Sequence, residues 1–459
     1  MHLYLPSSIN LCYDEKNEYD WTVTFMHMKK TFYALLLGLS LTFIPIAHAE
    51  VMTYEGTGEY IMSDFETPDI AKQRAKVRAE QNAIEQAGVY VRSYTKTINH
   101  IVTTDEVTAI ANTIIKIIDE KYTITPIDQK RGSILIQAKI KANVDSIQID
   151  SWLKQEHQKN IEFIEQLKRL QIERNKQDKE IQKLRQNLSI ATNDYEKSTL
   201  KKAIIDEDRK FLSKQKEKEA AILNQQGKII EAIALYSQSI GLDEKNFSAY
   251  FNRGLRYREQ KNYQQAIDDF TKALELNPQD VLAYNERGIM YEKQGEYMKA
   301  LQDYNKVIES NSSFSCWGYL NRGILYDRQK KALLAMADYN MAITLAPKFI
   351  IAYYNRGRLY LDMDNYSKAI HDLSKAIELS KTTTLDNFSS IDAYRYRGLA
   401  YNLSKQYNKA ITDFTKVIEL RPQDNRAYYG RGYAYEQLGY TSQSNIDYKK
   451  AQELEKNKS

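Results

Sequence analysis

Very few side chains in this sequence are placed for catalysis. The histidines after residue 49 are His100, His157 and His371, which lie far apart in the chain. Cys316 has no histidine near it in sequence, and an activated thiol needs a base. The sequence contains no H-E-x-x-H, G-x-S-x-G or Walker motif. We therefore predict a protein that is not an enzyme and that has no metal or other cofactor.

Gly56 and Gly58 are the only hint of a nucleotide-binding loop. A dinucleotide fingerprint would have a third glycine at position 61, where this chain has Ile61, and a helix directly after it. The residues from Val51 to Ser63 favour β structure instead. We therefore predict a strand here and no nucleotide site.

The densest pattern combines glycine, arginine, aspartate and tyrosine in the second half of the chain. Glycines at 254, 288, 323, 357, 398 and 432 are separated by 34, 35, 34, 41 and 34 residues. An arginine stands one residue before each glycine and an aspartate fifteen after, so we predict a bidentate pair that joins two helices. The alternative is a ladder of arginines that binds an acidic ligand. The predicted pairs are Arg253–Asp269, Arg287–Asp303, Arg322–Asp338, Arg356–Asp372, Arg397–Asp413 and Arg431–Asp447.

A period of 34 residues, with tyrosines four before and three after each glycine and alanine twelve after most of them, resembles the tetratricopeptide repeat. A further copy is in register at Ala220, which gives about seven repeats over residues 213–456. The resemblance implies a mainly α fold, a right-handed α-solenoid of helix pairs with a concave groove. It also implies a protein or peptide partner.

The groove candidates are first-helix residues on the side away from the tyrosines. Amide, aromatic and arginine side chains there suit a peptide main chain, because an amide both donates and accepts hydrogen bonds. The clamp that binds chaperone tails in this family needs lysines where the chain has Phe251, Leu282, Asn285 and Trp317, so we do not expect a carboxyl-terminal clamp. The candidates are Asn252, Asn321, Tyr354, Asn355, Arg358 and Arg395.

Residues 151–212 form a helical or coiled-coil connector in this interpretation. Apolar residues with two polar interruptions follow a spacing of four and three from Phe163 to Tyr195, which is typical of a coiled-coil seam. The seam could pair two chains into a homodimer through residues 163–195. It could equally belong to a helix that folds back on its own chain.

Residues 50–150 form a small α+β domain in this interpretation. The patterns predict the order β-α-β-α-β-β, with a helix from Pro68 that ends at Gly88 and a second strand over Val89–Ile98. Alanines recur every four residues from Ala71 to Ala87. With Gly56-Thr57-Gly58 and the run from Gln86 to Val91, this ladder resembles the amino-terminal module of the flagellar assembly protein T and related small exported-lipoprotein domains. The resemblance implies a non-catalytic module outside the cytoplasm.

Residues 28–49 have the three parts of a secretory signal peptide. Lys29 and Lys30 precede an apolar run from Thr31 to Ile46, and Ala47-His48-Ala49 provides an A-x-A cleavage site. We expect an exported protein, periplasmic or in the cell envelope. The alternative is an inner-membrane anchor made by an uncleaved segment 31–47. Residues 1–27 are expected to be an untranslated or disordered extension.

Charge and composition narrow the functional classes. The net charge of +5 is spread over 459 residues, whereas nucleic-acid binding needs a clustered basic face, so we expect no nucleic acid. We predict an extracytoplasmic scaffold that binds protein segments in its groove, with peripheral envelope association as an option. The alternative is a structural component of an envelope or flagellar-type machine that dimerises through the connector.

Overall fold

The computed structural model of the protein describes residues 51–62, 66–98, 100–128, 133–154, 157–381 and 390–456. The predicted extension and signal peptide, residues 1–49, lie outside the described residues. The chain divides into two compact units. We name residues 51–154 and 182–205 the sheet unit, and residues 157–181 and 206–456 the solenoid unit.

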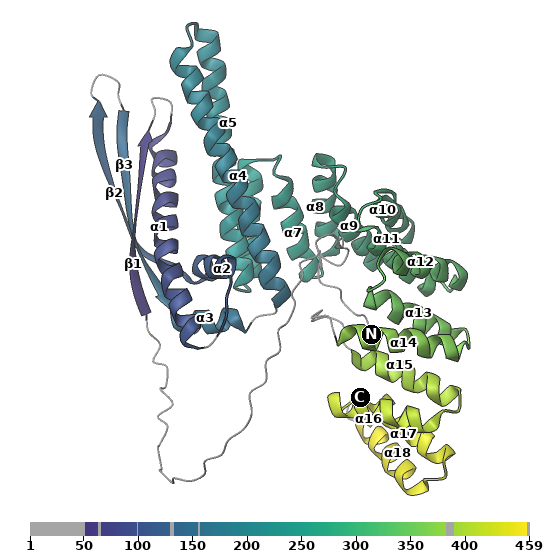
Figure 1. Ribbon diagram of the computed structural model, residues 1–459. Helices are drawn as coiled ribbons and strands as arrows, with labels where there is room; N and C mark the ends of the chain where they lie inside the picture. Colours follow the sequence, from purple (N-terminus) through teal and green to yellow (C-terminus); the bar gives the residue numbers. More distant parts are fainter. Residues whose placement is uncertain are drawn as a thin grey trace, which may run out of the picture. The chain divides into compact units, whose positions relative to one another are not determined.

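The sheet unit contains a three-stranded antiparallel sheet in the order β1-β3-β2, with a long helix, α1, along one face (Figure 1). Thr67 caps α1 by accepting a hydrogen bond from the Ile70 amide, and Thr103 and Glu106 form a capping box on α2. The elements are β1 (Val51–Met62), α1 (Pro68–Thr97), α2 (Thr104–Ile114), β2 (Lys116–Asp128), β3 (Ser133–Asp145) and α3 (Ser146–Leu153).

Gly56 and Gly58 allow α1 to lie directly on the sheet. A Cβ atom at Gly56 would stand 2.0 Å from the Ala79 carbonyl oxygen, and one at Gly58 would stand 2.2 Å from the Ala75 carbonyl oxygen. The alanines that face the sheet, Ala75 and Ala79 among them, are fully buried. The two glycines and the alanine ladder are therefore complementary parts of one close helix–sheet contact.

The predicted strand over Val89–Ile98 is wrong, because α1 continues to Thr97 and the observed order is β-α-α-β-β. Val91 and Thr95 are buried and extend the four-residue spacing of the alanine ladder, so the tertiary contact overrides the β propensity of this run. Gly88 lies inside the helix, where an added Cβ would come no closer than 3.4 Å to Val107. The other predicted strands and helices of this domain are present.

A buried carboxylate connects α4 to the sheet unit. The Glu66 side chain is fully buried and lies 2.7 Å from Arg185 and 3.2 Å from Arg74, and it accepts a 2.8 Å hydrogen bond from the Tyr60 hydroxyl. The guanidinium groups of both arginines also lie over the Tyr60 ring. A buried charge is tolerated because it is paired in this way.

The solenoid unit is a stack of antiparallel helix pairs (Figure 1). Two longer helices precede the stack, run through both units and pair antiparallel, as shown by Lys214–Glu173 at 2.6 Å and Gln225–Asn160 at 2.7 Å. These are α4 (His157–Ile190) and α5 (Asp194–Gln225). The helices that follow are α6 (Ile229–Leu242), α7 (Phe247–Glu259), α8 (Tyr263–Leu276), α9 (Val281–Gln294), α10 (Tyr297–Glu309), α11 (Ser315–Arg328), α12 (Ala332–Leu345), α13 (Ile350–Asp362), α14 (Tyr366–Ser380), α15 (Ser390–Leu403), α16 (Tyr407–Leu420), α17 (Asn425–Gln437) and α18 (Thr441–Lys456).

The predicted seam of the connector packs within this chain. Phe163, Leu170, Ile181 and Leu188 are all buried. The predicted boundary at residue 213 falls inside α5, whose last turns form the first helix of the first repeat. Ala220 there is buried in a cluster with Ala232 and Tyr236 of α6. The connector and the repeats therefore share one continuous helix.

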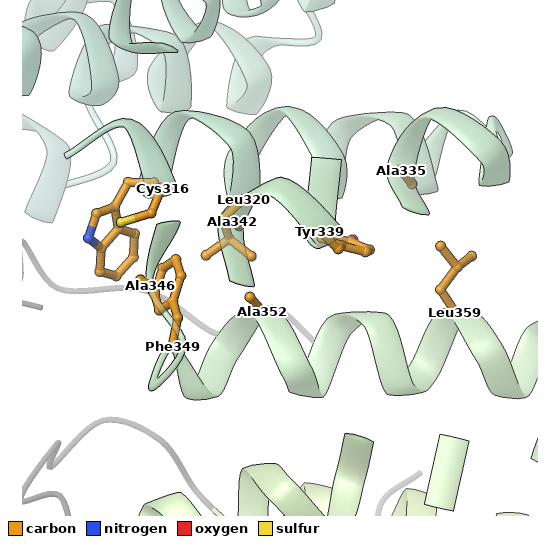
Figure 2. Packing of buried hydrophobic residues seen from close by; sticks show 10 residues of the cluster. Cys316, Leu320, Ala335, Tyr339, Ala342, Ala346, Phe349, Ala352 and Leu359 are labelled. Atoms are coloured by element: carbon orange, nitrogen blue, oxygen red, sulfur yellow. The ribbon is translucent and has the colours of Figure 1, made fainter. Parts of the chain in front are cut away.

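Large side chains fill the space between consecutive pairs, and small ones let the helices approach. Figure 2 shows Tyr339 of α12 lying between its own helix pair and α13, with Ala352 and Leu359 facing it. Trp317 packs edge-on against Phe349 with 4.8 Å between ring centroids. The turn inside each pair uses one left-handed residue at an equivalent position, seven after the repeat's glycine or, in the first repeat, after Ala220. These residues are Gly227, Lys261, Gly295, Lys330, Asp364, Lys405 and Gly439.

Within the described ranges, no helix combines the length and apolar character that crossing a membrane would require.

The contact between Gly58 and α1 predicts a strong effect of Gly58→Ala. The added methyl would overlap backbone atoms, which cannot move aside as a flexible side chain could, so we expect a loss of about 3 kcal/mol in the stability of the sheet unit. Hydrogen–deuterium exchange of the β1 amides measures this loss. The control is Thr57→Ala, whose side chain is exposed on the same strand. Equal exchange in the two variants would contradict the predicted packing.

Candidate functional site

Each predicted arginine–aspartate pair forms a bidentate contact inside its own repeat. In the repeat of α9 and α10, Arg287 donates from Nε to Asp303 Oδ2 at 2.8 Å and from Nη2 to Asp303 Oδ1 at 2.7 Å. Arg356 and Asp372 meet at 2.7 and 2.9 Å. The remaining pairs have the same geometry and are Arg253–Asp269, Arg322–Asp338, Arg397–Asp413 and Arg431–Asp447.

The same guanidinium groups also reach the preceding repeat. Arg287 Nη1 donates to Thr271 Oγ1 at 3.2 Å, and Arg356 Nη1 donates to Asn340 Oδ1 at 2.7 Å. Sequence reasoning missed this partner, although a small polar residue stands seventeen after Ala220 and after each glycine except Gly432. The other acceptors are Ser237, Asn305, Ser374 and Thr415. One arginine therefore joins three helices.

Tyrosine rings flank most of these arginines. Arg287 lies 5.6 Å from the centroid of Tyr284 and 5.8 Å from that of Tyr291. Burial opposes the charge of Arg287, but the hydrogen bonds to Asp303 and the charge of Asp303 outweigh it, so the pKa of Arg287 is raised. With the donors engaged inside the solenoid, the arrangement favours a structural role over the alternative ladder for an acidic ligand.

A second polar pairing connects the two helices of some repeats. The tyrosine stands sixteen residues after the repeat's glycine, and the glutamate stands four after it. The buried hydroxyl of Tyr304 donates to Glu292 at 3.0 Å, and the Tyr448 hydroxyl donates to Glu436 at 2.8 Å. Burial and the nearby Glu292 raise the pKa of Tyr304 well above its ordinary value, so the phenol stays neutral. The repeat of α11 and α12 has Tyr339 with the shorter Asp327, and within the described chain the Tyr339 hydroxyl has no partner. One missing methylene explains this unsatisfied hydroxyl.

The first helices of the repeats line the inner face of the solenoid. Among alternate helices of the described solenoid, the closer contacts join first helices, from α7 to α9 and onward to α17. Helices on the inside of a curved stack come closer together than those on the outside, so the first helices face the groove.

Two of the predicted groove amides are buried and form hydrogen bonds within the solenoid. Asn321 is buried and donates to Asn285 Oδ1 of the preceding first helix at 2.8 Å. Asn355 is buried and donates to the Ile351 carbonyl of its own helix at 2.9 Å. Asn252 is half-buried on α7. These amides therefore do not form one continuous recognition row.

The remaining candidates gather around Tyr396, which the candidate set omitted. The Arg358 guanidinium lies 5.8 Å from the Tyr354 ring centroid and 5.2 Å from that of Tyr396, and Arg395 lies 5.0 Å from that of Tyr396. The two rings meet edge-on at 6.0 Å. Tyr354, Arg358 and Arg395 thus share one aromatic–arginine cluster on α13 and α15. Tyr396 could have been predicted from the sequence, because it stands two residues before the glycine of its repeat, as Asn321 and Asn355 do.

The chain itself covers the amino-terminal end of the groove. Three α4 residues contact the first repeat: Asn160 bonds Gln225, Gln166 donates to the Tyr236 hydroxyl at 3.4 Å, and Glu173 pairs with Lys214. Lys214 and Gln225 stand six before and five after Ala220, on the groove side of the first helix. The open part of the groove therefore lies toward the later repeats.

Within the described ranges, no group of three or more His, Cys, Asp or Glu side chains is placed to hold a metal ion. Cys316 is fully buried and lies 3.4 Å from the Ser313 carbonyl oxygen.

Sequence models described as tetratricopeptide repeat match residues 247–280, 350–382, 270–302 and 426–458, and one described as TPR repeat matches 220–257 and 398–439. These segments carry tetratricopeptide repeats, and the carboxyl-terminal part of the chain is a tetratricopeptide solenoid preceded by a small α+β domain.

Three solved structures illustrate the similarity. PilW, a widely conserved type IV pilus biogenesis factor, is 17% identical over 47% of this chain and 96% of its own, with a TM-score of 0.42. YrrB, a TPR protein with an unusual peptide-binding site, is 22% identical over 40% and 91%, with a TM-score of 0.35. A tetratricopeptide repeat protein from Parabacteroides merdae is 20% identical over 53% and 93%, with a TM-score of 0.41. No curated protein matches the chain in sequence.

The bidentate pairs predict strong coupling between Arg356 and Asp372. Arg356→Ala leaves Asp372, whose side chain is 2% exposed, without its counterion, so each single alanine variant should lose about 3 kcal/mol of unfolding free energy. The double variant should lose less than the sum of the two, with a coupling of about 1–3 kcal/mol by chemical denaturation. Lys375 and Glu378 form an exposed pair on α14 and serve as the control cycle, with coupling below about 1 kcal/mol. Additive losses at Arg356 and Asp372 would rule out the pairing.

The unsatisfied Tyr339 hydroxyl predicts a stabilising substitution. In Asp327→Glu the longer side chain can reach Tyr339 as Glu292 reaches Tyr304, so the unfolding free energy should rise by about 1 kcal/mol. The reciprocal variant Glu292→Asp should lower it. Thermal denaturation of the full chain measures both. A neutral Asp327→Glu would show that chain length does not limit this contact.

Proposed function

We propose that the protein is a non-enzymatic scaffold outside the cytoplasm that binds a segment of a partner protein on the inner face of its repeats. The observation that carries the proposal is the open stretch of first helices α13, α15 and α17. There, aromatic, apolar and arginine side chains remain partly accessible. Leu399 and Tyr433, each directly after the glycine of its repeat, are 40% and 42% exposed. The residues at the same position in the earlier repeats are buried or half-buried.

The groove chemistry suits a peptide. Tyrosine and arginine provide large contact areas with polar edges, and such residues dominate the energetics of protein interfaces. The predicted signal peptide at residues 28–49 supports export. The resemblance of residues 50–150 to an exported flagellar-type module supports the same location, with peripheral envelope association through that module.

Dimerisation through residues 163–195 is not part of the proposal. A seam that joins two chains must be available on the surface, whereas Phe163, Leu170, Ile181 and Leu188 are buried in one chain. The alternative function, a component of an envelope machine, therefore has to rest on contacts other than this seam.

Site-specific photo-crosslinking in the protein's own cells tests the groove. A photoreactive amino acid at Leu399 should yield a discrete adduct with a partner, because this side chain is exposed on the inner face. The same amino acid at Ser367, which is exposed on the second helix α14, is the matched control and should yield none. Equal adducts at the two positions, or no adduct at Leu399, would contradict groove binding.

A further inference from the structure

The inner-face position directly after each glycine is apolar or aromatic in every repeat but one. Those of the earlier repeats pack in the hydrophobic core, and those of the last two repeats are partly exposed. They are Leu255, Ile289, Ile324, Leu399 and Tyr433. The exception is Arg358 on α13, which places a cation in the middle of this row.

Arg358 differs from three other arginines of the inner face in having no acceptor. Arg258 pairs with Glu286, Arg328 pairs with Glu292, and Arg395 pairs with Asp392 at 2.5 Å. Among the described residues, Arg358 makes no hydrogen bond and no ion pair. Its contacts are with the faces of the Tyr354 and Tyr396 rings.

The tyrosines leave the donors of Arg358 available. A ring can stabilise the cation through its face, but it accepts none of the five N–H groups in the geometry that a carboxylate offers. Burial works against the charge of Arg358, while Tyr396, Tyr354 and Asp327 raise its pKa, so it stays protonated. Asp327 weakens the positive potential through space but occupies none of these donors.

We infer that Arg358 binds an acidic side chain of the partner segment, and that apolar residues on either side of this acid contact Ile324 and Leu399. A planar guanidinium with both N–H edges free suits a carboxylate, which it can hold through two parallel hydrogen bonds. The equivalent positions on the neighbouring first helices α11 and α15 are the apolar Ile324 and Leu399. They favour apolar residues on either side of the acid in the bound segment. This inference rests on the proposed function and specifies its ligand as an acidic peptide.

Selection of short random peptides displayed on phage tests the inference on the full chain. Peptides selected by the wild type should be enriched in Asp or Glu at one fixed position with apolar neighbours. Arg358→Gln should abolish that enrichment, and Arg358→Glu should replace it with Lys or Arg. Lys416→Gln removes one exposed cation from the second helix α16 and is the matched control, which should select the wild-type motif.

A second measurement uses a wild-type-selected peptide and its variant with the acid replaced by the amide. By fluorescence anisotropy, Arg358→Gln should weaken binding of the acidic peptide by roughly tenfold to a hundredfold. The amide peptide should bind the wild type and Arg358→Gln equally. Circular dichroism of each variant verifies that the solenoid remains folded.

The outcomes separate the two proposals. Acidic enrichment that persists unchanged in Arg358→Gln, or peptides without an acid that compete for the groove, would overturn the role of Arg358 and leave groove binding standing. If no peptide is selected, or if selected peptides bind only outside the repeats, the proposed function fails and the acidic-ligand inference fails with it.

Discussion

The solenoid depends on one half-buried arginine in each of six repeats more than on any other polar group. Its guanidinium binds an aspartate on the second helix, a hydroxyl or amide on the preceding pair, and in most repeats two tyrosine faces on its own helix. Hydrogen bonds to charged groups contribute about 1.5–3 kcal/mol each, and their directionality fixes the angle between helices. The repeat therefore specifies both its own hairpin and its position on its neighbour.

This internal use of polar groups limits what the inner face can offer a partner. Where the amide column turns inward, as Asn321 and Asn355 do, the groove loses donors and acceptors. Where α4 lies against the first repeat, the groove is covered by the chain's own Asn160, Gln166 and Glu173. The proposed recognition surface consequently lies on α13 to α17, where the side chains depart from the repeating pattern.

The sequence allowed the repeats to be predicted because their signals are redundant: glycine, arginine, aspartate and tyrosine all recur in one register. The small domain lacked that redundancy. For Val89–Ile98 the local β propensity and the long-range alanine spacing gave opposite predictions, and only the sheet surface under α1 decided between them. The groove candidates were predicted from their position in the repeat alone. That position does not reveal whether an amide side chain is available to a partner or forms a hydrogen bond to Ile351 or Asn285 within the solenoid.

The tyrosines show how a repeat can tolerate exceptions without losing its fold. Tyr304 and Tyr448 have a glutamate within reach, whereas the equivalent positions with Phe270, Leu373 or Phe414 have no hydroxyl to satisfy. Tyr339 keeps the hydroxyl but has the shorter Asp327, whose charge instead acts on Arg358 in the next repeat. Aspartate at position 327 thus leaves one buried donor unsatisfied and also weakens the positive potential beside the unpaired Arg358. A local departure from the pattern is therefore connected to the surface where specificity is expected.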